Sequence, residues 1–131
     1  MKELTKEQAI AEHRKMWRWI AEETEKRREI VYKGEYLIKY FPDDDIYYSC
    51  FCCEYAIQKM LFENDRGSKI DNKCTFCPID WGGEVNAFMC ERKDLSTKNR
   101  GLYFLWVRTN DWKEAAELAR EIAELPERKE V

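Results

Sequence analysis

Residues 4–20, LTKEQAIAEHRKMWRWI, combine a helix start with the apolar stripe of a long helix. Thr5 is placed to cap the helix, and the side chain of Gln8 can reach back to the backbone of the cap, which is the capping-box pattern. Such a box marks where regular structure begins, because it satisfies backbone donors that a helix end leaves open. We therefore predict a helix that begins near Lys6.

Apolar side chains recur after this start at steps of three, four or seven residues, the period of one helix face. The stripe consists of Ile10, His13, Trp17, Ile20, Thr24 and Val31, widened by Met16 and Trp19. Gly34 supplies a stop, so we assign residues 1–34 to a long first helix. Trp17 and Trp19 lie about 200° apart on such a helix, so one of them is expected outside the main core.

A helical segment is also predicted at the other end of the chain, over residues 101–126. The run LYFLWV, residues 102–107, suits a buried strand or a buried helix, and we favour the helix. Asn110 or Asp111 can cap a further helix. Its apolar stripe is Trp112, Ala115, Ala116, Ala119, Ile122 and Ala123, followed by Pro126. The tail at 127–131 is expected to fray.

The six cysteines of the chain lie between these helices, in residues 47–90. Four of them form two CxxC pairs, namely Cys50, Cys53, Cys74 and Cys77. Two thiolates three positions apart can point to one centre, and two such pairs close a tetrahedron of soft ligands, which suits zinc. The spacing predicts a Zn²⁺ held by these four residues, with Cys52 and Cys90 as alternate ligands.

Other sulfur chemistry competes with zinc at the same residues. An iron–sulfur cluster would use the same thiolates, a CxxC dithiol would suit redox work, and unliganded cysteines would be small buried apolar side chains. The paired spacing favours zinc over all three. Four thiolates leave no coordination position for water, so the metal would contribute to folding and not to hydrolysis.

The predicted fold class is mainly α. It is a small single domain with a long N-terminal helix, a central zinc-clamped irregular unit and a C-terminal helical segment. A short helix is predicted within EYAIQKMLFEN, residues 54–64, and Pro42 is expected to end the apolar cluster of residues 36–41. The alternative is an α+β domain with a short strand pair at the zinc site.

Composition limits the classes of function. The net charge is −3 with 37% charged residues, so no strong cationic field is present to hold a phosphate backbone. No apolar leader and no window of membrane-spanning length occurs, which predicts a cytoplasmic protein without a membrane partner. Five tryptophans and seven tyrosines exceed the needs of a minimal core and favour a protein interface.

Catalytic motifs are scarce in the sequence. His13 is the only histidine, and a packed role on the apolar helix face is favoured over catalysis. No GxSxG or Walker motif occurs. The acidic run at 43–45 lacks the spacing of a calcium loop. The basic stretch 98–101 beside Tyr103 and Trp106 could touch phosphates and bases, but a solvated rim around buried aromatics is favoured.

A resemblance covers most of the chain after Tyr47. The stretches CFCCEYA at 50–56, CTFCPIDWGG at 74–83 and EAAELAREIAELPER at 114–128 resemble short cysteine-rich proteins of bacteriophages and prophages. The matching positions of the CxxCEYA and CxxCPxxW patterns are Cys50, Cys53, Glu54, Cys74, Cys77, Pro78 and Trp81. The resemblance implies a mobile-element origin and an accessory or anti-defence role.

The resulting hypothesis is a non-enzymatic, zinc-stabilised interaction protein. It would bind a host or phage protein in the bacterial cytosol and, in an anti-defence role, inhibit it. One alternative is a zinc-ribbon-like nucleic-acid-binding accessory factor. Another is a thiol-based redox factor, which requires Cys52 or Cys90 to be exposed. A homo-oligomer is compatible with each of these.

Overall fold

The computed structural model of the chain describes residues 4–42, 51–52, 55–56, 58–59, 77–80 and 102–128. These residues are mainly helical, as the sequence predicted. The elements are α1 (Lys6–Arg27), α2 (Lys33–Tyr40), α4 (Leu102–Arg108) and α5 (Trp112–Ala123). Within the described ranges, no helix has the length and the apolar character needed to cross a bilayer.

Helix α1 begins where the sequence places its start. The Thr5 side chain accepts a hydrogen bond from the Gln8 backbone N–H at 3.1 Å, and the Thr5 N–H donates to Gln8 Oε1 at 3.0 Å. The capping box is therefore confirmed at both of its bonds. The buried face of the helix consists of Ala9, Ile10, His13, Met16, Trp17, Ile20, Ala21 and Thr24.

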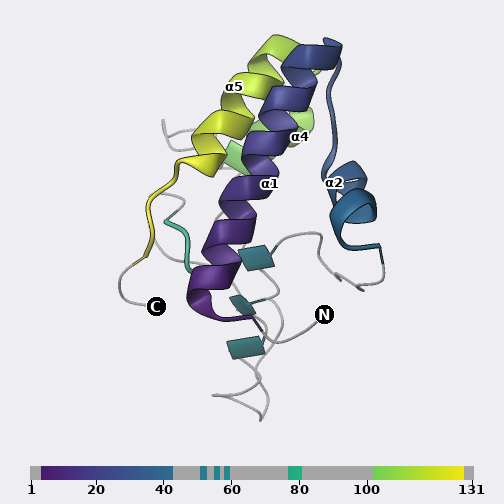
Figure 1. The fold of residues 1–131 in the computed structure, drawn as a ribbon. Coiled ribbons are helices and arrows are strands. Elements are labelled where there is room, and N and C mark those ends of the chain that lie inside the picture. The colour runs from purple at the N-terminus through teal and green to yellow at the C-terminus, as the bar shows by residue number, and fades with distance from the viewer. Residues whose placement is uncertain are drawn as a thin grey trace.

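Helix α5 packs against α1 along this buried face, and the two helices run side by side in opposite directions (Figure 1). Its N-cap is Asp111, whose side chain accepts from the Lys113 N–H at 3.1 Å. The buried side chains are Ala115, Ala116, Leu118, Ala119, Ile122 and Ala123. Four of these six are alanines, which lets the two helix backbones approach closely. The predicted final helix and its apolar stripe are confirmed.

Helix α4 confirms the helical interpretation of LYFLWV. Its one fully buried side chain, Trp106, meets Trp17 of α1 edge to face, with ring centroids 4.8 Å apart. Tyr103 lies against the same Trp17 ring at 6.2 Å. Edge-to-face aromatic pairs add to the energy of area burial. Trp17 is thus the point where α1 and α4 join.

The first helix is shorter than predicted. It ends at Arg27 and not at Gly34, because Arg28 adopts the left-handed conformation, with φ 55° and ψ 39°. The sequence predicts a longer helix because Val31 continues the apolar period of α1. Val31 is indeed buried, but it lies beyond the end of the helix. Gly34 falls inside α2. An arginine in place of the usual glycine gives no sequence signal for the stop.

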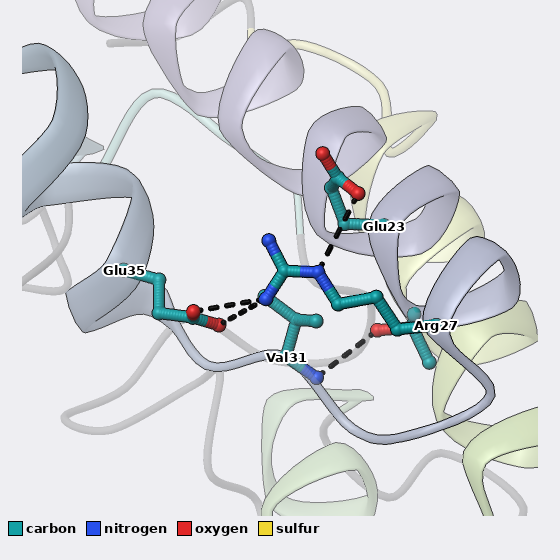
Figure 2. Close-up of polar contacts among 5 residues, drawn as sticks. Glu23, Arg27, Val31 and Glu35 are labelled. Atoms are coloured by element: carbon teal, nitrogen blue, oxygen red, sulfur yellow. Dashed lines mark hydrogen bonds and ion pairs between the residues drawn. The ribbon is translucent and has the colours of Figure 1, made fainter.

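Polar contacts fix the turn between α1 and α2 (Figure 2). The buried Val31 N–H donates to Thr24 Oγ1 at 3.2 Å, so the chain remains tied to α1 after the helix has ended. Arg27 reaches Glu23 at 3.6 Å and Glu35 of α2 at 2.9 Å. The ion pairs of Arg27 lie at the surface, where solvent screens them, whereas the Thr24 hydrogen bond is buried. The turn is thus held by one buried hydrogen bond and by ion pairs at the surface.

Helix α2 covers Trp19, the second of the two tryptophans in α1. The Trp19 ring lies 5.5 Å from the ring of Tyr36 and 6.3 Å from that of Tyr40. Tyr36 is buried, and its hydroxyl donates to Glu12 at 3.2 Å. Burial, together with this carboxylate, raises the pKa of Tyr36 above its ordinary value. Trp19 does leave the innermost core, but it is not an exposed partner-binding aromatic.

Candidate metal centre

Of the four predicted zinc ligands, the structure describes Cys77. Cys50, Cys53 and Cys74, and the alternate Cys90, lie outside the described residues. Within the described ranges, no three His, Cys, Asp or Glu side chains lie close enough to share a metal ion. The zinc site remains a prediction from the donor set, whose soft thiolates suit that metal.

The segment Cys77–Asp80 docks on the end of the chain. The Arg128 N–H donates to the Pro78 carbonyl at 2.7 Å, and the Asp80 N–H donates to the Pro126 carbonyl at 2.9 Å. Between them, Ile79 forms an isolated antiparallel bridge with Glu127. Figure 1 shows this teal segment beside the yellow C-terminal chain. The segment that begins at Cys77 is therefore joined to the residues that follow α5.

This docking corrects the expectation that the whole tail from residue 127 frays. Arg128 is only 6% exposed. Lys6 of α1 donates to the Arg128 carbonyl at 2.9 Å and pairs with the Glu127 carboxylate at the same distance. Glu127 and Arg128 are thus held by residues from distant parts of the chain. The local sequence, a run of charged residues, gives no sign of this.

The Arg128 side chain reaches the predicted metal ligand itself. Its Nη1 donates to the Cys77 carbonyl oxygen at 3.0 Å in a buried contact. Cys77 is 5% exposed, and Pro78 and Ile79 after it are fully buried. A guanidinium is charged at every physiological pH and presents several donors in a fixed plane. A permanent positive charge therefore lies next to the backbone carbonyl of Cys77.

The cysteine-rich unit also contacts the helices on its N-terminal side. Cys52 is fully buried, and its Sγ lies 4.0 Å from the Ala9 carbonyl oxygen of α1. The Leu4 N–H donates to Gln58 Oε1 at 2.9 Å. The ring of Phe51 packs against Tyr36 of α2 at 6.3 Å. The described residues between 51 and 59 are helical and lie against the start of α1 (Figure 1).

The burial of Cys52 bears on the redox alternative. A reactive thiol has to be accessible and of lowered pKa. Cys52 has no exposed surface and contributes to the apolar core around α1. Cys52 is therefore not accessible enough for the redox hypothesis. The other candidate, Cys90, lies outside the described residues.

His13 is packed, as the sequence analysis favours. It has no exposed surface, and its Nε2 lies 3.2 Å from the Ile122 carbonyl oxygen of α5. A carbonyl oxygen can only accept, so Nε2 carries the proton. The only histidine of the chain thus joins α1 to α5 and does not face solvent.

The aromatic residues near the basic stretch support the rim interpretation. Trp106 is 2% exposed, so its face is not available to stack on a base. Lys33 of α2 donates to the Tyr103 hydroxyl at 2.8 Å. Arg108 lies 5.3 Å from the centre of the Phe104 ring on its own helix. Residues 98–101 and the acidic run at 43–45 lie outside the described residues.

Comparisons with protein-family models, with curated proteins and with solved structures find no match to this chain.

Proposed function

We propose that this chain is a non-enzymatic, metal-stabilised binding protein that acts by occupying a surface of a protein partner. The observation that carries the proposal is a set of large apolar side chains exposed on α2 and its N-cap. Ile38 is 75% exposed, Tyr32 56% and Tyr40 44%. We call these three residues the α2 surface.

The α2 surface has the character of a protein contact. Large aliphatic and aromatic residues that gather on one element mark interaction sites, and tyrosine brings both an apolar ring and a polar hydroxyl. Two of the three residues are tyrosines. Ile38 lies about 200° around the helix from Tyr36 and faces away from the core, whereas the Tyr40 ring packs 4.7 Å from that of Tyr36. Tyr36 in the core and the ion pair of Glu35 with Arg27 hold the helix in place. A surface fixed before binding loses little entropy when the partner docks.

The site chemistry supports binding over catalysis. A zinc closed by Cys50, Cys53, Cys74 and Cys77 would have no open position for water. His13 lies in the helix interface and not at a surface where it could exchange protons with a substrate. The protein would therefore act in a fixed ratio to its partner. The resemblance to phage and prophage proteins makes a bacterial host or phage protein the proposed partner.

Changing Ile38 to glutamate is expected to weaken partner binding by about 30-fold or more, because a charge would replace a central apolar contact. The partner is first captured from bacterial host extract by the zinc-loaded, tagged chain. The purified pair is then measured by titration calorimetry, which gives both the affinity and the stoichiometry. The wild-type chain is expected to saturate at a fixed ratio.

Gln8→Glu is the matched control, because it adds the same charge at an exposed position and keeps the capping box. It is expected to bind like the wild-type chain. Unchanged affinity in Ile38→Glu would reject the α2 surface as the contact. Multiple turnover of a nucleic acid, peptide or phosphoester by the clean protein would reject the binding-protein proposal. Nucleic-acid affinity that falls steeply with salt would favour the accessory-factor alternative.

A further inference from the structure

Two lysines from different helices lie beside the exposed ring of Tyr40. Lys39 Nζ of α2 is 5.3 Å from the centre of that ring, and Lys15 Nζ of α1 is 5.9 Å from it. Lys39 Nζ also lies 6.0 Å from the centre of the Trp19 ring. Tyr40 is 44% exposed and both lysines are exposed, so a docking protein meets the ring and the two ammonium groups together.

The charge of the two lysines is not balanced by an ion pair. Among the described residues, no carboxylate lies within ion-pair distance of Lys15 or Lys39. Glu35, the only acidic residue of α2, pairs instead with Arg27. Glu12 of α1 accepts a hydrogen bond from a tyrosine hydroxyl of α2. In a chain whose net charge is −3, this part of the surface therefore carries a local excess of positive charge.

Lys39 stands between the two exposed apolar side chains of the helix. On an α-helix, Lys39 is about 100° from Ile38, and Tyr40 is about 100° further on. A partner that contacts both Ile38 and Tyr40 therefore covers Lys39. An ammonium group that is covered without a polar partner is costly, whereas a carboxylate compensates it with a charge-assisted hydrogen bond.

We propose that Lys15 and Lys39 bind carboxylates of the protein partner, which presents acidic side chains beside an apolar patch. The inference rests on the proposed function and adds the charge of the partner's surface. A second copy of this chain fits less well, because a two-fold contact through the same surface brings the same positive charge from both sides. Nucleic acid also fits less well, since the net negative charge of the chain repels a phosphate backbone.

Carbodiimide cross-linking of the purified complex tests the contact itself, because this reagent joins a lysine amine to a carboxylate without a spacer. Mass spectrometry of the digested complex is expected to find Lys15 or Lys39 joined to an aspartate or glutamate of the partner. Residues 43–45 of this chain, which lie outside the described residues, are the internal alternative. Links from the two lysines to residues 43–45, with none to the partner, would overturn the inference.

The double variant Lys15→Gln, Lys39→Gln tests the charge. At low salt it is expected to bind the partner roughly tenfold or more weakly than the wild-type chain, because two charge pairs are lost. At high salt the difference is expected to shrink, since the ions screen exposed charges. Lys113→Gln is the matched control, because Lys113 of α5 lies 5.6 Å from the centre of the Trp112 ring. This variant loses a lysine beside an aromatic ring outside the α2 surface and is expected to bind like the wild-type chain.

The outcomes separate this inference from the proposed function. Fixed-ratio binding by the wild-type chain, with equal affinity in the double variant, would overturn the acidic partner and leave the binding protein standing. Binding that nuclease treatment abolishes would identify a nucleic acid and overturn the inference. A wild-type chain that saturates with no partner at all would reject the proposed function, and the inference with it.

Discussion

Cys74→Ser is expected to lose the metal and to unfold at least the cysteine-rich unit at ordinary temperature. Structural zinc sites of this kind bind with apparent free energies of about 10–16 kcal/mol, and this binding is coupled to folding. The whole stability of a small domain is only about 5–15 kcal/mol. Losing one thiolate should therefore remove a large part of it. Thermal unfolding by circular dichroism, together with zinc content, measures the effect.

Cys52→Ala is the control for this experiment. Cys52 is fully buried beside α1, so its truncation should cost about 1–2 kcal/mol through lost packing. It should leave the zinc content unchanged. Alanine is chosen because serine would place a hydroxyl in the apolar core. Equal melting curves and equal zinc contents for the two variants would contradict the assignment of ligands.

Trp17→Ala is expected to cost about 3–5 kcal/mol of stability, the range for truncating a large buried aromatic. Trp17 is 2% exposed and lies edge to face against Trp106 at 4.8 Å. The change opens a cavity where α1 meets α4 and also removes the contact with Tyr103. Chemical denaturation of the zinc-loaded protein measures the free energy of unfolding.

Trp19→Ala provides the comparison within the same helix. Trp19 is half-buried and packs against Tyr36 and Tyr40 of α2, so part of its surface already faces water. Its truncation should cost about 1–2 kcal/mol. A loss for Trp19→Ala as large as that for Trp17→Ala would contradict the placement of Trp17, and not Trp19, in the innermost core.

The parts of the fold that the sequence predicts well depend on neighbouring residues. The capping box of Thr5 and Gln8 joins side chains three positions apart, and both bonds form as expected. The stripe of α5 reflects the helical period, and its alanines and Ile122 are buried. Such patterns can be recognised in the sequence because the residues that interact, or that share a helix face, are three or four positions apart.

The parts that the sequence does not predict depend on distant partners. The end of α1 at Arg27 is an exception, since it depends on the adjacent Arg28, whose left-handed conformation has no glycine to signal it. The docking of the tail needs Lys6 at the other end of the chain and the segment at Cys77. These contacts join residues more than fifty positions apart, so no local period or spacing signals them. Arg128 was missed for this reason.

The candidate metal site also has one part that the sequence predicts and another part that it does not. The two CxxC pairs are recognisable because ligands of one metal must stand a few residues apart in each pair. The groups that support the ligands carry no such spacing. Arg128 resembles any charged residue of a polar tail until its contact with Cys77 is seen. The contact between Arg128 and the Cys77 carbonyl is therefore found only from the structure.

Native mass spectrometry of the chain, purified without added metal or chelator, tests the proposed zinc site most directly. We expect a folded chain that carries one zinc ion, and we expect the ion and the compact charge-state distribution to be lost together when acid protonates the thiolates. A folded chain with an iron–sulfur cluster, or a folded chain with no metal at all, would contradict the proposed zinc site.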